Sequence, residues 1–350
     1  SLAEMRRGGL VVNSSSDLKG MEIDLPLTLG KTRQQSRKLE LQWRLSNSGA
    51  PSFKLDYGDM KLNMQHRQGG WNGEISSGAL AGRLTIPDAR GELVRADLER
   101  LDLAFSLDSQ AARSDSGGKR RSPHHLRPFH LTSNKLTLNG RPFGKLSVKT
   151  RHIPGGHEMT RLKVESPNDN LVASGSWMQQ GQGATTTLKL SLVAAEIGET
   201  LKSLDLSQQL DKAQGSIDAD LSWDGSPADF ATSRLNGTLL LDTKQGRFSE
   251  AQPGLARILG FLNIGALKRR LQLDFSDLTE KGFSFDEMRG RFALRKGAVS
   301  TDGDLVIKAP AADIHVSGDL DLATRQVEQK IRVIPDIHGM LPLAGVAAGG

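Results

Sequence analysis

The sequence predicts a mainly β protein, an elongated and mostly antiparallel sheet that carries one or two short helices. Two observations lead to this fold class. Apolar and polar residues alternate along most of the chain, which is the period of a strand with one buried face. Turn signals rich in Gly, Asp and Asn separate these stretches at short intervals, as they do in a meander of hairpins.

The composition of the 350-residue chain excludes several classes of protein. The absence of cysteine excludes thiol catalysis, thiolate metal sites and disulfides. The net charge of +6 arises from basic and acidic residues that mostly alternate, so we expect a solvated surface and no nucleic-acid partner. The chain has no apolar run of the roughly 18 residues that a membrane-spanning helix needs. Both ends look cut, and we expect a section of a longer protein.

The first section, residues 1–107, alternates regularly. Within 38–45, leucine and tryptophan occupy the odd positions and polar or charged residues the even ones. Turn signals such as Gly69-Gly70 separate the stretches. We interpret this section as the hairpins of one amphipathic sheet.

Residues 108–128 interrupt the alternation. They contain almost no apolar side chains and many Ser, Gly, Arg and Pro residues, which predicts a disordered loop or linker. The basic residues and histidines of this segment would also suit an anionic surface or a metal, but the composition favours a solvated loop.

The section 129–214 alternates again and ends in a short predicted helix, because apolar residues recur at helical spacing from Ile197 to Leu204. The last section, 215–350, begins with the most regular amphipathic strand of the chain, residues 215–225. Short alternating strands then continue toward the C-terminus.

The C-terminal section contains the longest departure from alternation, a predicted helix near 253–270. Pro253 suits a first helical turn, and the basic residues 268–270 suit a helix C-terminus. We expect this helix either to cap an apolar groove or to lie at a membrane interface, and we favour the cap because a strand follows at once. The residues assigned to this groove-cap helix are Leu255, Ile258, Leu259, Phe261 and Leu262.

The sequence contains no recognisable catalytic motif. We therefore expect no enzymatic activity and no metal or cofactor site. His157-Glu158 begins the H-E-x-x-H zinc motif, but Arg161 stands at the second ligand position. Aspartates two positions apart, such as Asp218 and Asp220, are explained by the polar face of a strand.

About twenty predicted strands and two helices leave a large apolar sheet face without a cover. The sheet would either close on itself as a sandwich or barrel, or curl into an open trough whose apolar floor holds a lipid-like ligand. An outer-membrane barrel fits less well, because one tyrosine and four tryptophans do not supply its aromatic girdles.

Three blocks of sequence, residues 246–292, 297–322 and 333–350, resemble the C-terminal part of the AsmA-like family, in its YhdP branch. Residues 16–31 resemble a family segment in which a Leu-Pro is followed by a Gly-Lys, although Thr28 stands where a second proline is expected.

This resemblance implies a β-taco fold with an open hydrophobic groove, in the periplasmic part of a Gram-negative protein anchored in the inner membrane. It implies that the groove carries phospholipid acyl chains between the inner and outer membranes, which the protein reaches through parts outside this chain. A β-rich scaffold or assembly factor for outer-membrane proteins, without lipid transport, is the alternative. The inward residues expected to line the groove are Ile217, Leu221, Trp223, Leu273, Phe275, Phe283, Phe285, Phe292, Leu294, Leu305, Ile307, Ile314, Val316 and Leu320.

Overall fold

The structure is a computed structural model, and it confirms the predicted fold class. Its strands form one 21-stranded, mostly antiparallel sheet, and the described residues contain one short α-helix. The residues that the structure describes are 2–6, 9–23, 30–46, 49–104, 122–203, 210–248, 283–310, 312–322, 324 and 326–335.

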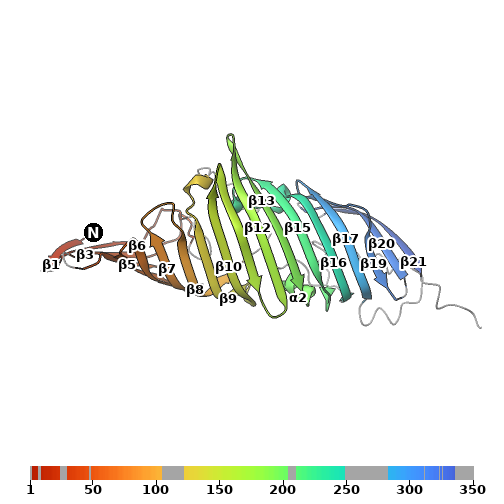
Figure 1. Cartoon of the computed structure of the whole chain (residues 1–350), viewed down its shortest axis with the longest axis horizontal. Helices are drawn as coiled ribbons and strands as arrows, with labels where there is room; N and C mark the ends of the chain where they lie inside the picture. Colours follow the sequence, from red (N-terminus) through yellow and green to blue (C-terminus); the bar gives the residue numbers. More distant parts are fainter. Residues whose placement is uncertain are drawn as a thin grey trace, which may run out of the picture. The chain divides into compact units, whose positions relative to one another are not determined.

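The chain divides into two compact units, of which the first comprises residues 1–190 and 222–230. Most of its strands pair with their neighbours in chain order (Figure 1). These strands are β1 (Leu2–Arg6), β2 (Gly9–Ser16), β3 (Leu39–Ser46), β4 (Ser52–Tyr57), β5 (Met60–Arg67), β6 (Gly70–Ser76), β7 (Leu80–Pro87), β8 (Val94–Leu103), β9 (Phe129–Leu138), β10 (Arg141–Ile153), β11 (Gly156–Glu165) and β12 (Asp169–Gln180).

Tight turns join most of these strands, as the turn signals predict. Asn139 and Gly140, between β9 and β10, have φ angles of 50° and 79°. Positive φ at both central residues is the requirement of a type I′ hairpin, which the Asn-Gly pair meets at low cost.

One pair of strands breaks the meander, because β8 and β9 run parallel. Parallel neighbours need a crossover connection in place of a hairpin, and residues 104–128 supply it. The described end of this connection contains the 3-10 helix η2 (Pro123–His125), which packs against β11 and β12. Pro123 is fully buried in that packing.

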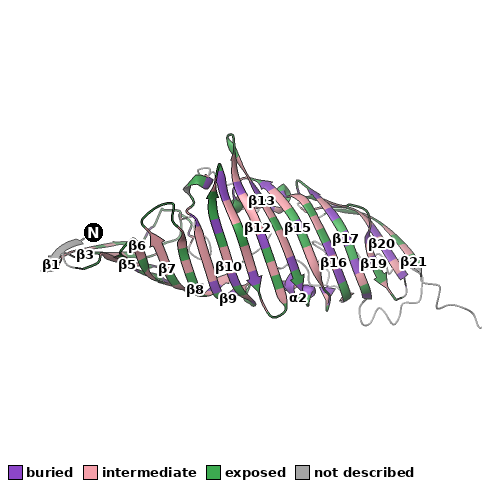
Figure 2. Cartoon of the chain, in the orientation of Figure 1, coloured by how far each residue is buried: buried purple, intermediate pink, exposed green. Residues whose placement is uncertain are grey.

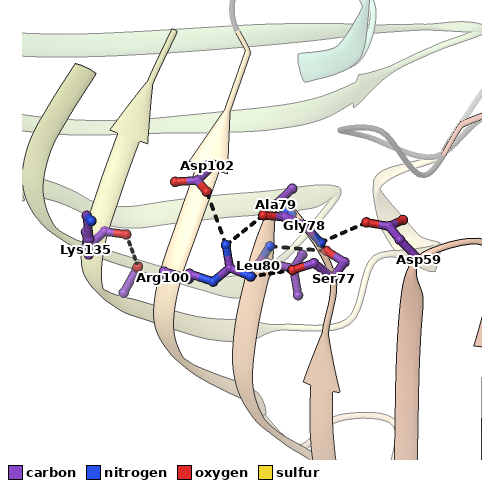
Figure 3. A network of polar contacts seen from close by, with 9 residues as sticks. Asp59, Ser77, Gly78, Ala79, Leu80, Arg100, Asp102 and Lys135 are labelled. Atoms are coloured by element: carbon purple, nitrogen blue, oxygen red, sulfur yellow. Dashed lines mark hydrogen bonds and ion pairs between the residues drawn. The ribbon is translucent and has the colours of Figure 1, made fainter. Parts of the chain in front are cut away.

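A polar network holds the turn between β6 and β7 against β8 (Figure 3). The Arg100 guanidinium donates to the carbonyl oxygens of Ser77 and Gly78 at 2.6 and 2.7 Å, and lies 3.6 Å from the Asp102 carboxylate. The Gly78 amide donates to Asp59 at 2.8 Å. The backbone groups that this turn leaves outside the sheet ladder are therefore satisfied by side chains.

The second unit comprises residues 191–221 and 231–350. Strand β17 pairs with β16 on one side and with both β18 and β19 on the other, and β20 also pairs with β18 and β19. The elements of this part of the chain are β13 (Gly183–Ala194), α2 (Ile197–Ser203), β14 (Leu210–Asp211), β15 (Gln214–Asp224), η3 (Pro227–Asp229), η4 (Thr232–Arg234), β16 (Asn236–Phe248), β17 (Phe283–Arg295), β18 (Ala298–Thr301), β19 (Leu305–Ala309), β20 (Ala312–Asp321) and β21 (Val327–Pro335), with β13, β15 and η3 contributing residues to the first unit.

Helix α2 confirms the short helix predicted from Ile197, and an ion pair ties it to β14. The Lys202 ammonium lies 2.6 Å from Asp211 and 2.9 Å from Glu199. The hydrogen bond to Asp211 raises the pKa of Lys202, with Glu199 adding to the effect. The apolar side of α2 is thereby fixed against the sheet, with Ile197 and Leu201 buried.

Candidate functional site

One face of the second unit gathers most of the predicted groove-lining residues. Cross-strand register aligns Met288, Ile307, Ile314 and Val333 in one row across β17, β19, β20 and β21. Residues two positions along each strand point to the same face, so a second row of paired residues lies beside the first. The neighbouring row on that face contains Leu305, Val316 and Ile331.

This face is deeply buried. Ile307 is 2% exposed, Ile314 3% and Val316 1%. They belong to one apolar cluster, to which α2 contributes Ile197 and Leu201. The predicted lining residues in this cluster are Phe285, Phe292, Leu305, Ile307, Ile314, Val316 and Leu320, with Ile217 packed against it.

Packing in this cluster depends on a glycine. Gly246 pairs with Phe285 across β16 and β17, and a Cβ at Gly246 would lie 2.2 Å from the Phe285 ring. The ring therefore occupies space that any other residue at position 246 would fill. It also contacts Phe248, with ring centroids 5.1 Å apart.

Other predicted lining residues lie apart from the cluster. Leu294 is buried, and Leu221 is half-buried. Trp223 belongs to the first unit, where it is buried and packs edge-to-face on Phe230. Phe283 begins β17 opposite Phe248.

Two groups of predicted residues fall outside the residues that the structure describes, and their assignments stay predictions. They are Leu273 and Phe275 of the lining and the groove-cap helix near 253–270 with Leu255, Ile258, Leu259, Phe261 and Leu262.

The first unit carries an apolar face that the sequence-based list of lining residues did not include. Register aligns Trp43, Phe53, Met64 and Gly73 across β3 to β6. The Trp43 and Phe53 rings stack with centroids 5.4 Å apart, and the Trp71 ring packs against both at 5.4 and 5.2 Å. These three rings are half-buried and remain accessible, whereas Met64 in the same row is 1% exposed (Figure 2).

Alternation in the first section contained the signal for this face. It predicts that Trp43 and Phe53 point inward, but Trp71 on β6 reaches Phe53 across β5 and Trp43 across both β4 and β5. Only the paired register shows that contact, because it depends on how far each strand slides past the next.

The alternate residues of these strands, whose side chains point to the other face of the sheet, are mostly polar. A cleft of about 480 Å³ lies against β3 to β6. Its polar lining residues are Gln42, Arg44, Ser52, Lys54, Asn63, Gln65, Asn72 and Glu74. Phe53, Met64 and Gly73 also line this cleft, so its lining is mostly but not entirely polar.

Among the residues described, no helix combines the length and apolar character needed to cross a membrane. Within the same part of the chain, no group of three or more His, Asp or Glu side chains is placed to hold a metal ion.

Comparison with known proteins supports the resemblance seen in the sequence. The family model described as YhdP protein matches residues 45–350. The intermembrane phospholipid transporter YhdP of Escherichia coli (strain K12) is 26% identical over 210 residues, which is 60% of this chain and 16% of that protein. No solved structure matches the chain. Because the family model covers most of the sequence, the chain belongs to the YhdP protein family.

Proposed function

We propose that this chain is a section of a conduit along which phospholipids move between the inner and outer membranes of a Gram-negative envelope. The acyl chains lie on the apolar face of the sheet, and the headgroups stay in water. The chain works in the periplasm as part of an inner-membrane-anchored protein, and it acts as a carrier surface without catalysis.

The observation that carries this proposal is the half-buried apolar face of β3 to β6. Trp43, Phe53 and Trp71 form its aromatic part, and Leu55, Leu62 and Ile75 align beside them. An acyl chain gains roughly 0.8 kcal/mol for each CH₂ group that it buries on such a surface. The name of the E. coli relative, an intermembrane phospholipid transporter, supports the same class of ligand.

In this proposal, the predicted lining residues of the second unit are not the first to contact lipid. Ile307, Ile314 and Val316 already bury one another and leave little surface for a ligand. Acyl chains reach them only where neighbouring side chains move apart, so we place the first lipid contacts on the first unit.

Site-specific photo-crosslinking in cells tests the proposal. Benzoylphenylalanine at Phe53 is expected to give phospholipid adducts, because position 53 belongs to the half-buried apolar face. The matched control is position 54, whose Lys54 is exposed on the polar face of the same strand. Protein adducts at position 53 without lipid would favour a scaffold or assembly factor for outer-membrane proteins.

Native mass spectrometry of the purified chain provides a second measurement. Gentle ionisation is expected to retain phospholipid, and Phe53→Asp is expected to release it, because the carboxylate must be desolvated where an acyl chain would lie. A parent chain that carries no lipid under these conditions contradicts the conduit.

A further inference from the structure

Four buried side-chain polar atoms of the first unit have no hydrogen-bond partner among the described residues; one is Arg127 Nε, and the other three belong to two paired side chains. These three are the two ring nitrogens of His157 and the indole Nε1 of Trp177. His157 is 4% exposed and Trp177 is 7% exposed, so bulk water does not reach these atoms. Buried polar groups in folded proteins are nearly always hydrogen-bonded, and an exception needs an explanation.

A β-bulge brings the two side chains together. His157 pairs with Trp177 across β11 and β12. Strict alternation would place His157 on the face opposite to Val164. One extra residue between Met159 and Leu162 shifts the register by one position, which turns His157 toward the apolar face.

The imidazole of His157 is neutral near pH 7. Burial lowers the pKa of His157, and His152, whose ring centroid lies 5.1 Å away, lowers it further. A neutral imidazole offers one N–H donor and one acceptor nitrogen, and the indole of Trp177 offers a second donor. The pair therefore presents two donors without a formal positive charge.

Trp223 in the same unit shows that the fold can satisfy a buried indole. Trp223 is also buried, but its Nε1 donates to the Ser226 carbonyl oxygen at 3.0 Å. Trp177 differs from Trp223 only in lacking such an acceptor among the described residues. The Trp177 N–H can therefore donate to a molecule bound at this face.

Resting on the proposed lipid conduit, we infer that His157 and Trp177 form a polar binding site within the apolar face, and that its ligand is the ester carbonyl oxygen of a phospholipid. Two neutral donors suit a carbonyl oxygen, whereas a phosphate is typically bound by Arg or Lys. Because the three nitrogens are buried, the ester oxygen reaches them from the apolar face only where neighbouring side chains move apart. Since the ester begins each acyl chain, this site fixes how far along the sheet the chain extends.

Comparison of ester and ether lipids tests this inference on the 350-residue chain. The probes are dioleoyl phosphatidylethanolamine in detergent micelles and its dialkyl ether analogue, which lacks both carbonyl groups. We expect the ether to bind the parent about tenfold more weakly, which corresponds to one hydrogen bond. His157→Phe and Trp177→Phe are each expected to reduce this discrimination measurably, because each removes one of the two donors.

Two further variants act as controls. His130→Phe removes an imidazole that already has a partner, Ser147 Oγ at 3.4 Å, and is expected to keep the parent's discrimination. His157→Gln keeps a donor and an acceptor and is expected to restore part of it. Circular dichroism on every variant distinguishes loss of the site from loss of the fold. If His157→Phe does not fold, Trp177→Phe tests the site in its place.

The outcomes separate this inference from the proposed function. If the parent binds the ester lipid and the variants discriminate against the ether as the parent does, water fills the pair and the inference is wrong. Dioleoylglycerol keeps both esters but lacks the phosphate. If the parent prefers the phospholipid over dioleoylglycerol and the variants lose that preference, the pair binds the phosphate and the ester assignment is wrong. A parent that binds no lipid at all overturns the conduit, and the inference with it.

Discussion

The three aromatic rings on β3, β4 and β6 and the apolar cluster of the second unit follow the same sequence pattern but are buried to different depths. In the first unit, Trp43, Phe53 and Trp71 are half-buried and covered mainly by one another. In the second unit, Ile307 and Ile314 are almost completely buried, in a cluster that includes residues of α2. Alternation therefore specifies which face is apolar, whereas the depth of burial depends on what packs onto that face.

The largest effect is expected from placing the same carboxylate on each face. In Ile314→Asp the charge is desolvated without a partner, and we expect a loss of about 3–5 kcal/mol in the free energy of unfolding. In Phe53→Asp the side chain remains partly hydrated, and we expect a loss of about 1–2 kcal/mol. Urea denaturation followed by circular dichroism measures both, and equal losses would contradict the difference between the faces.

Truncation to alanine compares the same two faces, with smaller expected losses in the free energy of unfolding. Ile307→Ala removes a side chain that is 2% exposed and leaves a cavity, which is expected to cost about 2–4 kcal/mol. Leu62→Ala removes a half-buried side chain, and we expect a cost of about 1 kcal/mol with little cavity contribution. Denaturation midpoints at an unchanged m-value check the order, and a larger cost for Leu62→Ala would reverse our view of the two faces.

A pH-dependent contribution is expected from His157 in the first unit. Its pKa in the folded chain lies below the ordinary value of 6.5, mainly because of burial. The unfolded chain therefore takes up a proton before the folded chain does. The stability that neutral His157 confers is complete above the unfolded pKa and is lost as the pH falls through the folded pKa.

His157→Phe removes this contribution. Thermal unfolding at about pH 7.5 and about pH 5.5 is expected to show a smaller decrease in Tm for the variant than for the parent. His152→Phe is the matched control, because His152 is exposed and adds only a minor part of the pKa shift. Identical decreases in parent and variant would show that His157 does not change its protonation between the two states.

The smallest effect is expected on the polar face of the second unit. Arg289 pairs with Asp242 at 3.0 Å and with the less exposed Glu287 at 2.5 Å, but its own side chain is about half exposed. An ion pair in such a position contributes roughly 0–1 kcal/mol, so Arg289→Ala is expected to change the unfolding free energy by less than about 1 kcal/mol. A loss as large as that of Ile307→Ala would mean that the polar face contributes to the core.

Much of the fold was predictable from local patterns. Alternation identified the inward residues Ile307, Ile314 and Val316, because side chains in a strand point alternately to its two faces. The Asn139-Gly140 turn was predictable because few residues tolerate positive φ. The division into four sections and the groove-cap helix stay predictions.

Features that depend on distant partners were not predictable in this way. The bulge that turns His157 inward inserts one residue, and local sequence does not show where an extra residue is placed. The packing of Trp71 on Trp43 depends on the register of three strand pairs. The parallel pairing of β8 with β9 depends on a crossover whose path no local pattern encodes.

That parallel pair also has a consequence for how the chain acquires its structure. Most hairpins on either side of it form by closing turns of a few residues, with residues 17–38 between β2 and β3 as an exception, whereas joining β8 to β9 requires closure of residues 104–128. If this segment closes as a free loop, its entropy costs roughly 2 kcal/mol more than that of a two-residue turn. We therefore expect the strands before and after the crossover to form as separate stretches, with their union at β8 and β9 among the slower steps in assembling the first unit.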